Sequence, residues 1–405
     1  AAPGAQSVRR YREPGGLPAE VRANLPRGPV VHVPARVLAV SLAVLMAMGG
    51  AGAAVGFQRD RAARAHASLA QVDAALQDAS ENPLVATSMI SQAEHALQSA
   101  RDAGADATLI AQYDRAVSAA RDTVWNVRRL QDVRQLGSLP ANAAADGVRL
   151  ALNGDTLYIA ARNLYELDPA ASRLLTLLAA GDQVGGEKAG PIRDVSVDGG
   201  QVVAGDGAAR YIRDAQGVWQ RQSLAVDGVG GISETLPIIT WGDAAYGISW
   251  EGDIVRFHDT SAGSRAEVWA ASSLNPDLLQ TRDLSIDGTI HVLLQDGRIL
   301  TFSRGALAAT TTPFVTPRLT APQALAQAPL AGDVYLVDSD AVVGGNQGRI
   351  VRVNANGDAM QYLTPEHGGA RDAMAHMQEA AIDELTGTVY WVANGVVWQG
   401  QLPPG

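Results

Sequence analysis

Residues 193–199 read RDVSVDG, and residues 282–288 read RDLSIDG. In both stretches apolar and polar side chains alternate, which is the pattern of a β-strand that buries one face. Both end in Asp-Gly, a pair that favours a tight hairpin turn because glycine adopts positive φ without strain. The two stretches start 89 residues apart, about twice the ~40–45 residues of a four-stranded repeat. The sequence therefore predicts a repeated β-sheet unit, with one further copy between these two.

Similar strand and turn signals recur from about residue 147 to the C-terminus. First strands are expected to begin at six positions: Val148, Arg193, Pro237, Arg282, Gln323 and Glu379. The steps between them are 41 to 56 residues, and units of this size with about four strands each are typical of the blades of a β-propeller. We therefore predict a mainly β fold, a six-bladed β-propeller over residues 134–405.

The last unit supplies only three clear strands, at residues 379–383, 389–392 and 396–402. A blade without its outer strand would leave an unpaired sheet edge. We assign residues 134–139 as the missing fourth strand, which would close the ring by joining the start of the propeller to its end.

Residues 59–133 are alanine-rich and show helical periodicity. Three helices are expected, at about residues 60–78, 82–104 and 106–127, each with apolar side chains at three-four spacing. The third is capped by Asp106 and carries Val124 and Val127 on its apolar face. We interpret this region as a short antiparallel helical stalk.

An uncharged, apolar segment at residues 37–58 precedes the stalk. Its residues 37–57, twenty-one in a helix, rise about 31 Å, which matches the ~30 Å hydrocarbon core of a bilayer. The Pro-rich segment 1–36 holds six Arg against two Glu, so the positive-inside rule places this tail in the cytoplasm and the propeller outside a single-pass cell membrane anchor. The alternative is a signal peptide with a long basic leader, cleaved near residues 51–53.

Gly52 and Gly56 form a GxxxG pattern within this segment. Small residues let two membrane helices approach closely, so this face is a candidate for packing on another helix. The alternative is an Ala- and Gly-rich span without a partner. We expect the lipid bilayer and other membrane-protein subunits as partners.

Composition excludes several functions. The chain has no Cys, which rules out thiolate nucleophiles and cysteine-ligated metals, and its net charge of −10 argues against nucleic acid as a partner. The seven His are scattered, and only His367 and His376 lie close together in one loop, so we expect no metal centre and no cofactor. No motif of a nucleophile elbow, a P-loop or a dinucleotide site is present, and we assign no catalytic residue.

Three Arg-Asp pairs are the candidate ligand-binding residues: Arg193-Asp194, Arg282-Asp283 and Arg371-Asp372. They precede first strands, which converge on the central channel of a propeller. A ring of guanidinium and carboxylate groups there would bind a small anionic or sugar-like ligand. The alternative is that each arginine pairs with a nearby aspartate and only stabilises the loops.

Four tryptophans are also candidates for stacking on a sugar, if they are exposed: Trp241, Trp250, Trp391 and Trp398. The alternative is that they pack between adjacent blades, as aromatic residues commonly do.

The order of basic segment, single span, Ala-rich helices and propeller, with RDVSVDGG- and DGRIL-type blades, resembles the membrane-bound C-terminal half of bacterial PPM-type (metal-dependent) protein phosphatase-like proteins. The resemblance covers about residues 30–405. Residues 348–358, GRIVRVNANGD, are similar to NHL-type propeller repeats. The phosphatase domain of that family would precede residue 1, so none of its metal-binding aspartates carries over; the chain is either a shortened relative or lacks an upstream portion.

Together these features lead us to expect a non-catalytic, extracytoplasmic propeller that acts as an interaction, scaffold or ligand-sensing subunit of a larger membrane assembly. The alternative is a propeller enzyme of the lyase or lactonase type with an acidic channel site. Convergent carboxylates that hold a metal in the channel would favour the enzyme.

Overall fold

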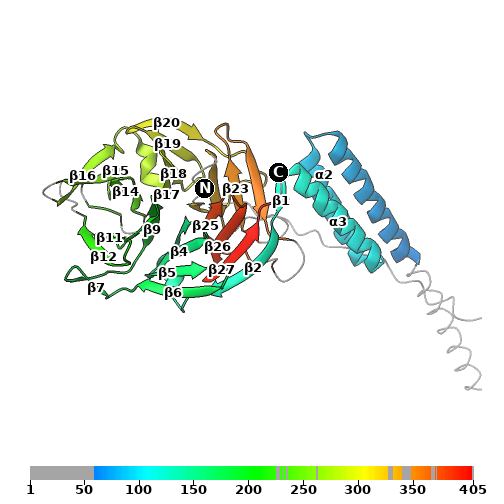
Figure 1. Cartoon of the computed structure of the whole chain (residues 1–405). Coiled ribbons are helices and arrows are strands. Elements are labelled where there is room, and N and C mark those ends of the chain that lie inside the picture. The colour runs from blue at the N-terminus through cyan, green and yellow to red at the C-terminus, as the bar shows by residue number, and fades with distance from the viewer. Residues whose placement is uncertain are drawn as a thin grey trace, which may run out of the picture.

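The computed structural model describes residues 59–403, apart from residues 225–228, 230, 234–235, 261–262, 327–331, 340–347, 366–369 and 371. Within these residues three α-helices precede six β-sheets of four or five strands, and these sheets are arranged around a common centre (Figure 1). The first strands of neighbouring sheets contact one another all the way round, including the contact between the sixth sheet and the first. The chain therefore forms a six-bladed β-propeller, as the repeat pattern predicts.

Each blade is built on antiparallel strands that follow one another in the chain, and blades five and six each gain one strand from the N-terminal side. Blade one contains β3 (Arg149–Asn153), β4 (Thr156–Ala161), β5 (Asn163–Asp168) and β6 (Arg173–Leu178). Blade two contains β9 (Asp194–Asp198), β10 (Gln201–Gly205), β11 (Ala209–Arg213) and β12 (Trp219–Ser223), and a small hairpin of β7 (Gln183–Val184) and β8 (Glu187–Lys188) precedes it. Blade three contains β13 (Ile239–Trp241), β14 (Ala244–Ile248), β15 (Ile254–Thr260) and β16 (Gly263–Ala270).

The second half of the ring continues this pattern. Blade four contains β17 (Thr281–Ile286), β18 (Ile290–Leu294), β19 (Ile299–Ser303) and β20 (Ala306–Thr311). Blade five contains β21 (Pro322–Ala326), β22 (Val334–Asp338), β23 (Arg349–Val353) and β24 (Ala359–Leu363). Blade six contains β25 (Met377–Asp383), β26 (Thr388–Ala393) and β27 (Val396–Gln401). The turns between first and second strands contain a glycine at positive φ, for example Gly199 at +55° and Gly288 at +112°, which explains why these turns are visible in the sequence.

A strand from the N-terminal side completes blade six. Strand β2 (Gln131–Ser138) pairs antiparallel with β27, and the backbone N–H of Leu139 donates to the carbonyl of Gly395 at 2.8 Å. The strand overlaps residues 134–139, where the sequence places the closing strand. The two ends of the propeller chain are therefore held in one sheet.

Another short strand, β1 (Val127–Arg129), lies parallel to β24 as a fifth strand of blade five. The expectation that Val127 belongs to the third helix is therefore wrong. That helix ends at Val124, and Asn126 adopts a left-handed conformation (φ +53°) that breaks it. The backbone of Val127 then finds hydrogen-bond partners at the edge of β24, and its side chain packs against Leu363.

The three helices comprise residues 59–81, α2 (Ala86–Asp102) and α3 (Ala107–Val124). The Asp106 side chain accepts hydrogen bonds from the N–H groups of Thr108 and Leu109 and so caps α3 as predicted. None of the helices in the described part of the chain is long and apolar enough to cross a membrane. The tail 1–36 and the proposed span 37–58, with Gly52 and Gly56, lie outside the described residues.

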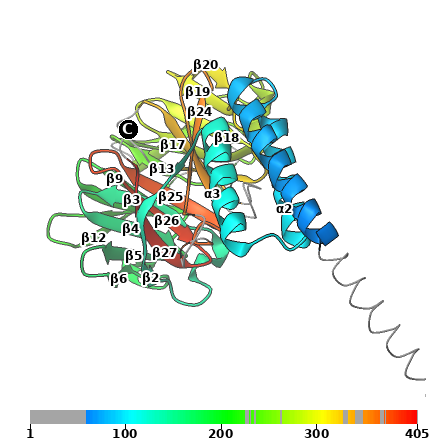
Figure 2. The same ribbon diagram turned by 90° about the vertical axis from the view of Figure 1, so that its right-hand side faces the viewer.

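The helices lie beside the propeller, next to blade five (Figure 2). Polar contacts fix this junction. The Asn126 side chain donates to the Ala359 carbonyl at 2.8 Å, and Arg129 forms a bidentate ion pair with Asp122 of α3, both N–O distances being 2.7 Å. The helical stalk is thus tied to the outer edge of one blade.

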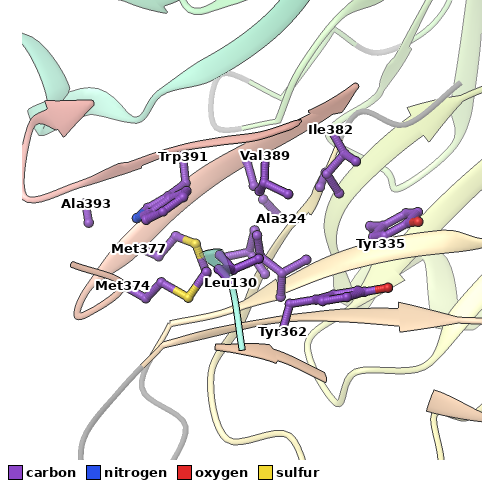
Figure 3. Packing of buried hydrophobic residues seen from close by; sticks show 14 of the residues in the cluster. Leu130, Ala324, Tyr335, Tyr362, Met374, Met377, Ile382, Val389, Trp391 and Ala393 are labelled. Atoms are coloured by element: carbon purple, nitrogen blue, oxygen red, sulfur yellow. The ribbon is translucent and has the colours of Figure 1, made fainter. Parts of the chain in front are cut away.

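The core is divided among the interfaces between blades. Between blades five and six, Trp391 packs with Met374, Met377 and Leu130, the last of which precedes β2 (Figure 3). Trp391 is fully buried, and its indole N–H donates to the Ala373 carbonyl at 2.7 Å. This tryptophan therefore packs between blades and is not a candidate for stacking on a ligand.

Candidate functional site

Charged residues occupy one equivalent position on four of the six first strands. Each lies four residues before an Asn or Asp at the end of its strand, namely Asn153, Asp198, Asp287 and Asp383: these charged residues are Arg149 on β3, Asp194 on β9, Asp283 on β17 and Glu379 on β25. Because the first strands of all blades surround the central channel, the shared position brings these side chains together at the centre of the propeller. Asp194, Asp283 and Glu379 are buried.

Arg149 links three blades across this centre. Its Nη2 lies 2.5 Å from Asp283 Oδ1 and its Nη1 lies 2.8 Å from Asp283 Oδ2, which is the bidentate geometry of a strong ion pair. Nη1 also lies 2.6 Å from Glu379 Oε2. Asp283 in turn accepts a hydrogen bond from the backbone N–H of Leu325 in blade five at 2.7 Å. We call Arg149, Asp194, Asp283 and Glu379 the central cluster.

The central cluster has three carboxyl groups and one guanidinium. Burial raises the pKa of Asp194 to about 7, although the charge of Arg149 works against this shift. Burial likewise raises the pKa of Glu379, opposed by Arg149 and reinforced by Asp283. Burial alone would lower the pKa of Arg149, but Asp283 and Glu379 outweigh it and raise the pKa further, so the guanidinium remains charged. The central cluster therefore holds protons near neutral pH that isolated carboxyl groups would have lost.

Two cavities meet at Arg149, which lines both. The wide cavity, of about 610 Å³, opens at the end of the channel where the first strands begin. Its polar lining includes Arg193, Arg282, Gln295, Gln323, Ser339 and Gln378. The narrow cavity, of about 160 Å³, lies toward the hairpin turns. Its apolar walls include Leu152, Val197, Ile239, Ile286, Val334 and Ile382.

Two of the Arg-Asp pairs predicted from the sequence are divided between the central cluster and the wide cavity. Asp194 and Asp283 belong to the central cluster, whereas Arg193 and Arg282 are exposed and line the wide cavity. The split arises because successive side chains of a strand point in opposite directions. The Arg282 guanidinium donates to the side-chain oxygen of Gln323 in blade five, which orients it.

Asp372 of the third pair does not join the site. Asp372 is exposed in a turn before β25 and lines neither cavity, and Arg371 lies outside the described residues. In blade six the equivalent position is held by Glu379. Sequence reasoning missed Arg149 and Glu379 as site residues because it searched for a repeated dipeptide. The usable signal was the Asn or Asp that follows each of these charged residues by four positions, at Asn153, Asp198, Asp287 and Asp383.

Within the part of the chain that the structure describes, no group of three or more His, Asp or Glu side chains could hold a metal ion. In the channel the guanidinium of Arg149 takes the place between the carboxylates that a cation would otherwise occupy. The segment NANGD at 354–358 is a turn: the Asn354 side-chain oxygen accepts hydrogen bonds from the N–H groups of Asn356 and Asp358.

No protein-family model matches the chain, and no curated protein matches it. Solved structures do. A gluconolactonase from Xanthomonas campestris is 12% identical, with 68% of this chain and 97% of that one covered and a TM-score of 0.45. A protein of unknown function from Bacteroides thetaiotaomicron is 11% identical, with 68% and 73% covered and a TM-score of 0.46. A chain of a mitotic checkpoint complex is 9% identical, with 69% and 95% covered and a TM-score of 0.44.

Proposed function

We propose that this chain is a non-catalytic, ligand-binding propeller that recognises a small anionic, hydroxyl-rich molecule in the wide cavity. The observation that carries the proposal is the convergence of Arg193 and Arg282, from blades two and four, on one cavity. Two guanidinium groups are suited to a carboxylate or phosphate, because each presents planar, paired N–H donors.

The glutamine side chains of the lining suit the same class of ligand, and Asp146 is its one carboxyl group among the described residues. The cavity volume of about 610 Å³ falls within the ~300–1,000 Å³ of ordinary small-molecule sites. The carboxamides of Gln295, Gln323 and Gln378 both donate and accept hydrogen bonds, as recognition of hydroxyl groups requires. A sugar acid combines the anionic group and the hydroxyl groups that these side chains would bind.

The central cluster supports a binding role over catalysis. A lyase or lactonase with an acidic channel would need carboxylates that can reach the substrate. Two of the three, Asp283 and Glu379, are held by Arg149 at 2.8 Å or less. They link blades one, four and six and so act in the structure of the propeller.

One observation favours the enzyme as a second candidate. Burial raises the pKa of Asp194 to about 7, which is the range of an effective general base. Aldonolactone hydrolysis by the purified chain, abolished by Asp194→Asn, would support this candidate. Hydrolysis at the uncatalysed rate would support the binding role.

We further propose that residues 37–58 anchor the chain in the cell membrane, with the tail 1–36 in the cytoplasm and the propeller outside. Gly52 and Gly56 would pack on a helix of another subunit. The stalk, tied to blade five through Asn126 and Arg129, would connect the ligand-binding propeller to that assembly. Such an arrangement is consistent with the resemblance to the membrane-bound half of phosphatase-like proteins.

The test is isothermal titration calorimetry on the 405-residue chain purified in detergent. Gluconate and galacturonate are the anionic probes, and glucose and galactose are the neutral controls. We expect saturable binding of a sugar acid that weakens about tenfold or more in Arg282→Gln, because a charge-assisted hydrogen bond is lost. Arg173→Gln, at an exposed position on the outer strand β6, is the matched control and should bind as the unmodified chain does. Equal binding by all three proteins would contradict the proposal.

A further inference from the structure

The narrow cavity has a chemistry opposite to that of the wide one. Four carboxyl groups line it, those of Asp194, Asp287, Asp333 and Glu379. Arg149 is its one guanidinium, and His291 its one imidazole, among the described residues. The surplus of acidic groups makes this end of the channel attractive to cations.

Three of these carboxyl groups are already engaged by side chains. Asp287 accepts from the Thr289 hydroxyl at 2.8 Å and lies 3.3 Å from His291 Nε2. Asp333 is bound by Arg352 at 2.7 Å. Glu379 is bound by Arg149 at 2.6 Å.

Asp194 differs from the other three. Its only hydrogen bond among the described residues comes from the backbone N–H of Val195, and Arg149 acts on it at longer range, without an ion pair. The residue is 5% exposed and borders the cavity. A buried carboxylate without a paired cation is costly, because burial removes its hydration. A cation that enters the cavity would offset that cost.

The size and walls of the cavity define the rest of the ligand. Its volume of about 160 Å³ is close to that of an engineered protein cavity of ~150 Å³ that binds benzene. The apolar walls from blades one to six favour a hydrocarbon group. Trp241, which is 40% exposed, and Tyr335 lie at its hairpin-turn end, and the face of an aromatic ring attracts a cation.

We propose that the narrow cavity binds a small organic cation, a primary ammonium group on a compact apolar group, with Asp194 as its counter-ion. The ammonium group would donate hydrogen bonds to the Asp194 carboxylate, and the apolar group would fill the space between the walls. This site is separate from the wide cavity, so the inference does not rest on the proposed function.

Binding is expected to depend on pH in one direction. The charged groups that act on Asp194 are Arg149 of β3 and Asp283 of β17. Glu379 of β25, Asp287, His291 and Asp333 line the same cavity. A cation binds the ionised carboxylate, and binding releases a proton when Asp194 is protonated beforehand. Since burial raises the pKa of Asp194 to about 7, the affinity should rise between pH 6 and pH 8, up to about tenfold per pH unit at the acidic limit.

The experiment is calorimetric titration of the 405-residue chain with benzylamine and, as the uncharged analogue, benzyl alcohol. Benzylamine should bind more tightly than benzyl alcohol, with affinity rising from pH 6 to pH 8. Asp194→Asn should weaken benzylamine binding about tenfold or more and remove this pH dependence. Asp198→Asn, at the other end of β9 and outside the cavity lining, is the matched control. It should change neither the affinity for benzylamine nor the pH dependence of that affinity.

Thermal unfolding of each variant shows whether it is folded. Ile239→Phe fills the cavity while leaving Asp194 in place, and it too should abolish benzylamine binding. The proposal is overturned if benzylamine and benzyl alcohol bind equally, if neither binds, or if folded Asp194→Asn binds benzylamine as the unmodified chain does. It is also overturned if calcium chloride alone binds through Asp194 and benzylamine does not, because the site would then be a metal site.

Discussion

Arg149 of blade one and Asp283 of blade four form a bidentate ion pair across the centre of the propeller, with N–O distances of 2.5 and 2.8 Å. Since blades one and four lie opposite each other in a six-membered ring, this pair joins two halves of the molecule that share no sheet. It also separates the two cavities of the channel, because Arg149 lines both.

Replacing Arg149 with methionine should strongly destabilise the propeller. The change leaves the buried carboxyl groups of Asp283 and Glu379 without their paired cation and removes the positive charge that acts on Asp194; breaking a buried ion pair in this way costs roughly 3–5 kcal/mol. The loss should be smaller at pH 5 than at pH 7, because protonation neutralises the orphaned carboxylates. Urea unfolding at the two pH values measures both effects. Arg173→Met is the control, with an expected change below about 0.5 kcal/mol; a similar loss in the two variants would contradict the role of the pair.

The central cluster should make stability fall as pH rises. Burial raises the pKa of Asp194 to about 7 and also raises that of Glu379. The folded state therefore holds more protons than the unfolded state from about pH 4, the ordinary carboxyl range, up to these raised values. The stabilisation that protonated Asp194 contributes is fully present below about pH 4. It is lost as pH increases through about 7.

The measurement is the free energy of unfolding at pH 5, 6, 7 and 8 for the unmodified chain and for Asp194→Asn. The difference between them should change by on the order of 1 kcal/mol per pH unit within this window. Asp198→Asn should follow the unmodified chain. A pH-independent difference between the unmodified chain and Asp194→Asn would show that Asp194 titrates at its ordinary value.

Strands β1 and β2 should be required for a stable ring. A chain that begins at Asn126 keeps both strands, whereas one that begins at Pro140 exposes the edges of β24 and β27. We expect the shorter chain to melt at a lower temperature and to aggregate more, with a loss of several kcal/mol at about 0.5–1.5 kcal/mol per hydrogen bond. Identical melting and aggregation would mean that β2 is not needed for closure.

A substitution at Leu130 tests the packing between blades five and six without shortening the chain. This leucine is 1% exposed in the core between blades five and six, so Leu130→Ala should cost about 2–5 kcal/mol. Leu84→Ala, at a position that is 96% exposed, should change stability by less than about 0.5 kcal/mol. Thermal unfolding of the two variants checks this difference.

The sequence was informative where local chemistry decides the structure. Alternating strands and turn glycines such as Gly199 and Gly288 revealed the blades, because a tight hairpin imposes its requirements on a few neighbouring residues. Strand β1 was missed because its three residues, Val127–Arg129, pair in parallel with β24, more than 230 residues away in the sequence. The edge of β24 lies next to β1 only in the folded chain.

The site was partly predictable for a similar reason. Asp194 and Asp283 were found because their blades repeat the same dipeptide, but Arg149 has no such neighbour. Its role follows from its position along β3, which only alignment to the Asn153-Gly154 turn reveals. The pairing of Arg149 with Asp283 rather than with Asp194 depends on the geometry across the ring, which no local pattern encodes.

The proposed topology predicts a protease result in intact spheroplasts. Externally added protease should remove the propeller and spare an epitope inserted near residue 5, because the arginine-rich tail is retained in the cytoplasm. Lysis of the spheroplasts should make the epitope sensitive as well, which is the control. A protected propeller would contradict the proposed orientation.

The most direct test of ligand binding in the wide cavity is chemical footprinting of its arginines. The 405-residue chain would be treated with phenylglyoxal with and without saturating gluconate, and the modified arginines would be quantified by mass spectrometry. Arg193 and Arg282 are exposed and line the cavity, whereas the exposed Arg173 lies on an outer strand and serves as the internal reference. The account predicts that gluconate protects Arg193 and Arg282 and leaves Arg173 unchanged. Equal modification of all three arginines with and without gluconate would contradict it.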